Sequence, residues 1–355
     1  MNQRSCVTIV LPHLAKAAAV PRDALPLNIR RAVALSLPFR WNDARAYRLP
    51  PKGGPLGAYY IGWRADTTAW GEDWSVSPLD HRGVLLTLRG AFYHPIRIAQ
   101  YALHSHSRWI ETRSGAAFRA FVAQAQWLRD HQQERHGISG CYPFTFSWPR
   151  YGAASGWISA MAQGEAISVL LRADEMLPRE GYFDAALRAA APFQADVREG
   201  GVVWQSRDDT FFEEIAVPRA AHVLNGHIFA MFGLWELHRL THERWVEELV
   251  AKALDTLRRR LPLYDSGYWS FYSLLAYGGK FRAVATLKYH AFHIAQLRVL
   301  AAMFGERRFD AVARRWETYQ MSAASRLRVM GNTVRALGTR ALRLDGIRKS
   351  TDVLA

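Results

Sequence analysis

The feature that most constrains the fold is a succession of eight segments with helical periodicity between residues 95 and 320. Apolar residues recur in each segment at spacings of three and four, which is the pattern of an amphipathic helix that buries one face. The segments span residues 95–111, 115–133, 156–177, 183–198, 219–240, 242–260, 287–304 and 307–320. Eight consecutive helices predict four helical hairpins, and hairpins arranged around a ring would gather their loops at one end of a pocket.

The part of the chain before these segments has a different pattern. Residues 48–57, LPPKGGPLGA, concentrate the Pro and Gly residues that interrupt regular structure. Residues 59–88 are rich in aromatic and β-branched residues broken by Gly and Pro, which is typical of short strands. We therefore predict a mainly α fold that is preceded by an irregular arm and a small β region.

The charge balance indicates an anionic partner. The 355 residues include 46 Lys and Arg against 31 Asp and Glu, a formal net charge of +15. Such a balance affects association more than fold, and it leaves nucleic acid, anionic lipid and an acidic polysaccharide open. Arginine-glycine repeats and RNP-like strands are missing, so we expect no nucleic-acid partner.

Cysteine content and the N-terminal sequence bear on the compartment. Cys6 and Cys141 are too few for a disulfide framework and lack the spacing of a zinc site, which fits a reducing cytoplasm. Pro12, His13 and Lys16 interrupt the only early apolar run. No apolar stretch reaches the roughly 18 residues that span a bilayer, so we expect a soluble, cytoplasmic protein.

The last 35 residues form a basic segment with seven Arg and Lys against two Asp. Such a segment could lie as an amphipathic helix on the anionic inner face of a membrane; the alternative is a solvated terminal helix. We divide the chain into an N-terminal part (1–90), a helical catalytic domain (91–320) and this tail (321–355).

Two clusters precede or begin a predicted helix. Glu213 and Glu214 follow two phenylalanines in DDTFFEEIAVP. A carboxyl group held among aromatic rings can serve as an acid or base; the alternative is an exposed acidic turn. Asn225 in VLNGHIFAMFGLWEL begins an apolar helix, where its ordinary role is an N-cap.

Two further clusters lie near residues 261–293. The segment LPLYDSGYWSFYSLL gathers aromatic residues that can stack on sugar rings or, as phenols, transfer a proton: Tyr264, Tyr268, Trp269 and Tyr272. In KYHAFHIAQL, Tyr289 adjoins His290, and His293 follows one turn later. Packing or substrate contact is the favoured interpretation of the two histidines, because a metal site needs a third ligand and none is evident.

Taken together, these segments resemble the C-terminal region of the D-glucuronyl C5-epimerases, over roughly residues 91–320. The matching phrases occur in the order of the family: FYHPIRIAQYAL, GWISAMAQGEAISVLLRA, FFEEIAVP, VLNGHIFAMFGLWEL, LPLYDSG, YHAFHIAQL and VARRWETY. The resemblance implies an (α/α) barrel of about four hairpins behind a small β portion. It also suggests a homodimer.

The resemblance implies site residues as well. Tyr272, Tyr289 and Glu214 fall on catalytic positions of the family. Expected substrate contacts are Tyr93, Trp157, Gln163, Asn225, Tyr268, Trp269, His290 and His293. One departure is Leu275, which stands where the family has an arginine and cannot pair with a uronate carboxylate; Lys280, Arg282 and Lys288 are nearby cations.

The implied activity is conversion of D-glucuronate to L-iduronate within a heparosan-like glycan, for example in capsule synthesis. The C5 hydrogen is α to a carboxylate, so its removal creates an enolate-like dianion that cations or donors must stabilise. Tyr289 or Glu214 would act as one proton-transfer group and Tyr272 as the other, and no cofactor is required. The alternatives are a uronate lyase and a noncatalytic acidic-glycan-binding protein.

Overall fold

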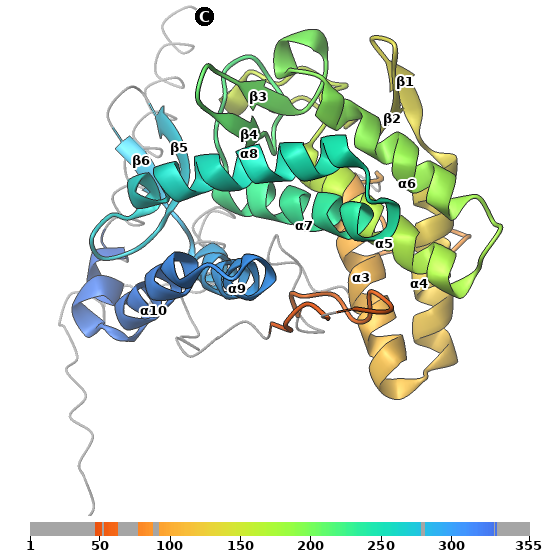
Figure 1. The fold of residues 1–355 in the computed structure, drawn as a ribbon, viewed down its shortest axis with the longest axis horizontal. Helices are drawn as coiled ribbons and strands as arrows, with labels where there is room; N and C mark the ends of the chain where they lie inside the picture. The colour runs from red at the N-terminus through yellow and green to blue at the C-terminus, as the bar shows by residue number, and fades with distance from the viewer. Residues whose placement is uncertain are drawn as a thin grey trace, which may run out of the picture. The chain divides into compact units, whose positions relative to one another are not determined.

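The computed structural model describes residues 47–51, 53–62, 77–87, 92–277, 281–329 and 331 (Figure 1). Apart from residues 323–329 and 331, all of these belong to one compact unit that spans residues 42–322. Most of the basic tail, and the part of the predicted β region from 63 to 76, lie outside the described residues. Among the described helices, none combines the length and the apolar character needed to cross a membrane.

Eight α-helices of this unit pair in sequence order into four hairpins. The first helices of the hairpins form an inner layer: α3 (Pro95–Thr112), α5 (Ala160–Met176), α7 (Leu224–Thr241) and α9 (Leu287–Phe304). The second helices pack outside them: α4 (Gly115–Asp130), α6 (Tyr182–Ala190), α8 (Arg244–Arg260) and α10 (Arg307–Met321). Each inner helix contacts the next inner helix along the chain. The prediction of a mainly helical, barrel-like fold of four hairpins is confirmed.

The β structure of the described residues consists of isolated bridges and short hairpins. Before Pro95, the described residues hold isolated antiparallel bridges, such as Leu79 with Leu85, and no named strand. Three two-stranded antiparallel sheets lie later in the chain, in the connections between helices. Their strands are β1 (Gln133–Arg135) with β2 (Ile138–Cys141), β3 (Val203–Gln205) with β4 (Thr210–Phe212), and β5 (Phe271–Tyr277) with β6 (Phe281–Val284).

Two predicted helices begin later than expected. Ser159 ends an extended segment and caps α5 by accepting a hydrogen bond from the backbone N–H of Ala162. The chain before α7 is irregular as far as Val223, which has an extended backbone and forms an antiparallel bridge with Ser273 of β5. The residues before both helices continue the apolar pattern, so periodicity alone placed them inside the helices.

The inner helices α5 and α7 cross at glycines. A Cβ atom on Gly233 would lie 2.0 Å from the carbonyl oxygen of Gly164. A Cβ atom on Gly164 would lie 2.5 Å from the Cα of Ala230. The two backbones therefore touch directly, and side chains at these positions would force the helices apart.

The C-terminal ends of the inner helices are closed by the segment around Gly57. Arg172 of α5 forms a fully buried bidentate ion pair with Glu236 of α7, and its Nε donates to the carbonyl oxygen of Gly57 at 2.9 Å. The N–H of Leu56 donates to Glu175 at 2.9 Å. The open loops are consequently those at the other end, before the N-termini of α5, α7 and α9.

We predict that Gly233→Ala destabilises the protein. Insertion of a methyl group into a backbone contact costs about 1–3 kcal/mol, which corresponds to a fall in Tm of several degrees by calorimetry. The matched control is Gly115→Ala, in the first turn of α4, where the nearest atom to an added Cβ is an arginine nitrogen at 3.5 Å. An unchanged Tm for Gly233→Ala would contradict the direct backbone contact.

Candidate active site

Glu213 and Glu214 follow strand β4 directly, and both are buried. Glu213 is 0% exposed and Glu214 is 2% exposed, so the alternative of an exposed acidic turn is wrong. The backbone of Glu213 is fixed on both sides, because its N–H donates to Val202 and its carbonyl oxygen accepts from the N–H of Ala160. The first amide of α5 thus positions the acidic pair.

The Glu214 carboxyl group has two donors from different elements. The phenol of Tyr272 in β5 donates to Oε1 at 3.0 Å, and Nδ2 of Asn225 in α7 donates to Oε2 at 3.2 Å. Asn225 is therefore not the N-cap of α7; that position belongs to Val223. Gly226 makes room for the carboxyl group, since a Cβ there would lie 2.5 Å from the Cβ of Glu214.

Burial raises the pKa of Glu214 to about 7. The hydrogen bonds from Tyr272 and Asn225 lower this pKa in part, and the adjacent carboxylate of Glu213 raises it. Near neutral pH the group is therefore present in both protonation states, which is the condition that favours an acid–base catalyst.

Tyr289 completes this cluster from the first turn of α9. Its ring meets the ring of Tyr272 edge to face, with centroids 4.8 Å apart. Burial raises the pKa of both phenols, and the charge of Glu214 raises both further. Both phenols are consequently proton donors at neutral pH, and both residues remain partly exposed while Glu214 is covered.

The two predicted histidines lie in α9 and bind Ser270, the residue directly before β5. Ser270 Oγ lies 2.8 Å from Nδ1 of His290 and 2.8 Å from Nδ1 of His293. His290 donates from Nε2 to the carbonyl oxygen of Trp316 and stacks on Trp269 with centroids 3.8 Å apart. Burial lowers the pKa of His290 to about 3 and that of His293 well below its usual range. Both rings are therefore neutral. Through Ser270 they fix the start of β5, which carries Tyr272, against α9, which carries Tyr289.

The other predicted contact residues occupy varied positions. Gln163 is fully buried, accepts from Tyr142 N and donates to the carbonyl oxygens of Gly140 and Ala189. The phenol of Tyr93 donates to Asp80 at 2.7 Å.

The remaining two predicted contacts, Tyr268 and Trp157, lie in connections between helices. Tyr268 is partly exposed in the connection before β5. Trp157 lines a surface pocket of about 370 Å³ together with Arg135 and Arg198.

Comparison with known proteins assigns the family. A family model described as D-glucuronyl C5-epimerase C-terminus matches residues 136–318, just over half of the 355 residues. The chain belongs to the D-glucuronyl C5-epimerase family. The predicted resemblance is thereby confirmed.

Individual relatives of this epimerase-family chain cover parts of it. The D-glucuronyl C5-epimerase of Caenorhabditis elegans is 30% identical over 213 residues, which are 56% of this chain and 35% of that protein. An uncharacterized protein of Methanocaldococcus jannaschii is 26% identical over 160 residues, or 44% of this chain and 52% of its own. The chain thus spans about a third to a half of the length of these relatives.

A solved structure is also similar. The crystal structure of an unsaturated glucuronyl hydrolase from Bacillus sp. GL1 has a TM-score of 0.43 and 16% sequence identity, and the match covers 63% of this chain and 61% of that chain.

The departure from the family pattern at Leu275 can be located. Leu275 lies in β5, three residues after Tyr272, and is packed against the hydrophobic core. Of the nearby cations, Lys280 and the side chain of Arg282 lie outside the described part, and Lys288 is partly buried in the first turn of α9.

Sequence reasoning missed Glu165, a buried carboxyl group of α5. It accepts a hydrogen bond from Gln100 of α3 at 3.1 Å. Burial, and to a smaller extent the charge of Glu214, raises the pKa of Glu165 well above its usual range. The signal was present, since Glu165 is the one charged residue in the mostly apolar stretch AMAQGEAISVLL.

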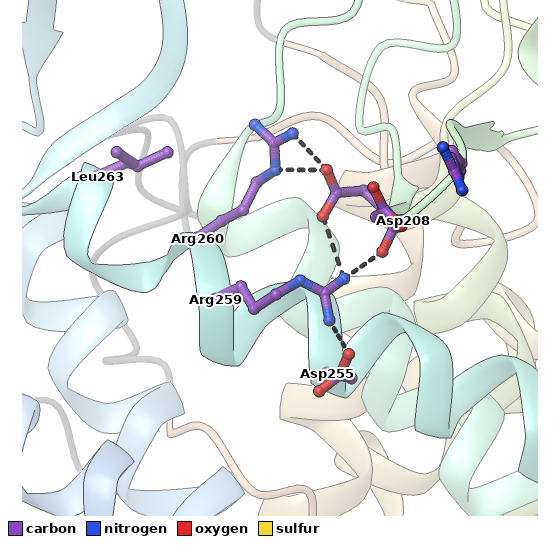
Figure 2. A pocket seen from close by; sticks show the side chains of 7 residues that line it. Asp208, Asp255, Arg259, Arg260 and Leu263 are labelled. Carbon is purple, nitrogen blue, oxygen red and sulfur yellow. Dashed lines mark hydrogen bonds and ion pairs between the residues drawn. The ribbon is translucent and has the colours of Figure 1, made fainter.

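A surface pocket of about 700 Å³ is lined by three arginines and three aspartates (Figure 2). Asp209 accepts from Arg259 and Arg260, and Arg259 also pairs with Asp255. This network ties the β3–β4 hairpin to the end of α8, and therefore supports the strand that leads to Glu214. Arg259 and Arg260 already have carboxylate partners, so the pocket does not resemble a polyanion-binding groove. Within the described ranges, no cluster of three or more His, Cys, Asp or Glu side chains has the geometry to hold a metal ion.

We predict a distinct pH dependence of stability from Glu214. Because its pKa is raised in the folded protein, its stabilising contribution is fully present below the unfolded pKa near 4.5 and is lost as pH rises through about 7. Between pH 5 and 8, wild type should therefore lose about 3 kcal/mol relative to Glu214→Gln in urea unfolding. Glu247→Gln, on the exposed face of α8, is the control. Parallel pH profiles for wild type and Glu214→Gln would contradict this account.

Proposed function

We propose that this protein is a uronate C5-epimerase that converts D-glucuronate to L-iduronate residues within an acidic, heparosan-like polysaccharide. The observation that carries the proposal is the cluster of Glu214, Tyr272 and Tyr289 in a chain of this family: the phenol of Tyr272 donates to Glu214, and its ring contacts the ring of Tyr289. A base with a pKa near neutrality stands beside two protonated phenols, and C5 epimerisation requires such a combination of proton acceptor and donor.

Burial favours an order of proton transfers. Tyr272 is partly exposed and Glu214 is covered, so the phenol meets the sugar and the carboxylate acts behind it. As the Tyr272 oxygen takes the C5 proton, its own proton passes to Glu214. Tyr289 then donates its phenolic proton to the opposite face of C5. Glu214 then releases its proton to solvent and Tyr289 takes one up, which restores the starting state.

Electrostatics support an acidic glycan as the substrate. The chain has a formal net charge of +15. The N-termini of α5, α7 and α9 lie next to Glu213, Asn225 and Tyr289 respectively, and helix N-termini favour anionic groups. Trp157 and Arg135, which share a pocket, are suited to a neighbouring sugar of the chain. Membrane contact through the basic tail, a cytoplasmic location, homodimerisation and a role in capsule synthesis stay predictions.

Incubation with heparosan in heavy water tests the proposal. Deuterium at C5 without chain cleavage is the result expected of an epimerase. A 4,5-unsaturated product would instead indicate the uronate lyase, in which C5 deprotonation is followed by loss of the C4 oxygen. Binding with neither product would indicate a noncatalytic glycan-binding protein.

We predict that Tyr272→Phe lowers C5 exchange by about 100-fold or more, the size of a general acid–base contribution. The ring and its packing stay, and only the phenol is lost. Tyr142→Phe is the control, because it removes another buried phenol, which donates to Leu128 at 2.7 Å away from the cluster. Near-normal exchange in a folded Tyr272→Phe protein would remove Tyr272 from the mechanism.

We also predict that glycan affinity decreases with salt. Attraction between a polyanion and several Lys and Arg side chains is screened as the Debye length falls from about 10 Å at 0.1 M to about 3 Å at 1 M. Isothermal titration calorimetry across this range measures the effect. An affinity that does not change with salt would argue for a neutral ligand.

A further inference from the structure

His222 has an unusual backbone conformation next to the catalytic cluster. It is one of five described non-glycine residues with positive φ, at 49°. The others lie in exposed turns or at helix ends: Arg113, His136, Arg179 and His242. His222 is instead partly buried in the connection between β4 and α7. Left-handed backbone in a non-glycine residue costs about 1–2 kcal/mol, and such strain tends to persist at functional sites.

Several hydrogen bonds hold His222 in this conformation. Its N–H donates to the Glu213 carboxylate at 3.1 Å. Its carbonyl oxygen accepts from the phenol of Tyr264 at 2.7 Å and from the N–H of Leu274 at 3.4 Å. His222 is therefore fixed between the residue before Glu214 and the residue two positions after Tyr272.

The same carboxylate orients the imidazole ring. Nδ1 of His222 lies 2.5 Å from Oε1 of Glu213. A carboxylate only accepts hydrogen bonds, so Nδ1 carries a proton and Nε2 is the nitrogen left for another partner. The rings of Trp204 and Phe211 flank the imidazole, each with its centroid 4.6 Å away, and 12% of the side chain is exposed.

The pair of Glu213 and His222 is suited to bind an anionic group. Glu213 is fully buried, and a buried carboxylate is stabilised by an opposite charge, which His222 supplies when it is protonated. The neighbouring aromatic faces also favour a cation. Removal of the C5 proton from a uronate places additional negative charge on the substrate carboxylate, and Leu275, on the adjoining strand, cannot neutralise it.

We propose that His222, oriented by Glu213, binds the carboxylate of the reacting uronate by donating a hydrogen bond from Nε2. The inference rests on the proposed epimerase function. It assigns the two adjacent acids different roles, because Glu213 orients the carboxylate-binding imidazole and Glu214 takes part in proton transfer.

Calorimetric binding of two oligosaccharides tests the proposal: heparosan fragments, and the same fragments with their carboxylates reduced to hydroxymethyl groups. His222→Asn is the key variant, because asparagine tolerates positive φ but has no imidazole. A charge-assisted hydrogen bond is worth about ten- to a hundredfold in affinity. We expect His222→Asn to weaken binding of the natural fragments by that factor and to leave binding of the reduced fragments unchanged.

His242→Asn is the matched control, since it makes the same change at an exposed left-handed histidine that caps the far end of α7. Glu213→Gln is a second variant, which keeps the ring but removes the charge that holds it, and it should act in the same direction as His222→Asn.

Each of the following results would overturn the inference. Equal losses for natural and reduced fragments would indicate a structural role for His222, and unchanged binding of natural fragments by a folded His222→Asn protein would indicate none. Wild-type protein that binds natural and reduced fragments equally, or neither, would overturn the uronate-based function as well. Wild-type protein that prefers the natural fragments, with the same preference in His222→Asn, would overturn only the role of His222.

Discussion

The burial of the Glu214 carboxyl group is the interaction on which the rest of the site depends. Withdrawal from water raises its pKa to about 7, and the donors Tyr272 and Asn225 keep the charged form accessible. Three elements must meet for this to happen: the end of β4, the first turn of α7 and strand β5. β4 leads to Glu214 itself, while β5 and α7 contribute the phenol of Tyr272 and the amide of Asn225 that donate to its carboxyl group. Loss of the group would leave a phenol and an amide without their common acceptor.

One end of the inner helices stabilises the fold, and the other end carries the polar residues of the candidate site. At the C-terminal end, Arg172 and Glu236 form a buried ion pair beneath the Gly57 segment, and this pair links α5 to α7. At the N-terminal end, short hairpins carry the polar groups, and the helix dipoles favour anions. The close crossing at Gly164 and Gly233 keeps α5 and α7 in a fixed relation. The rigid end thus supports the precise placement of side chains at the open end.

Local periodicity predicted the helices well, because each hairpin buries one continuous apolar face. It failed before α5 and α7, where the residues continue the apolar pattern but their backbones bond to other segments: Ile158 accepts from the N–H of Ala216, and Val223 bridges Ser273 of β5. The role of Asn225 depended on a tertiary contact with Glu214, which no local rule contains. His222 had no signal in the sequence, since its importance arises from backbone strain and from the carboxylate of a residue nine positions earlier.

The pH dependence of C5 exchange is the measurement that tests the central claim most directly. If Glu214 must be ionised to receive the Tyr272 proton, kcat/KM for deuterium incorporation should rise through an inflection near pH 7. Glu214→Gln should retain little exchange, and its residual rate should show no inflection there. A wild-type profile that is flat between pH 5 and 8 would contradict the claim that this buried carboxylate drives the proton transfer.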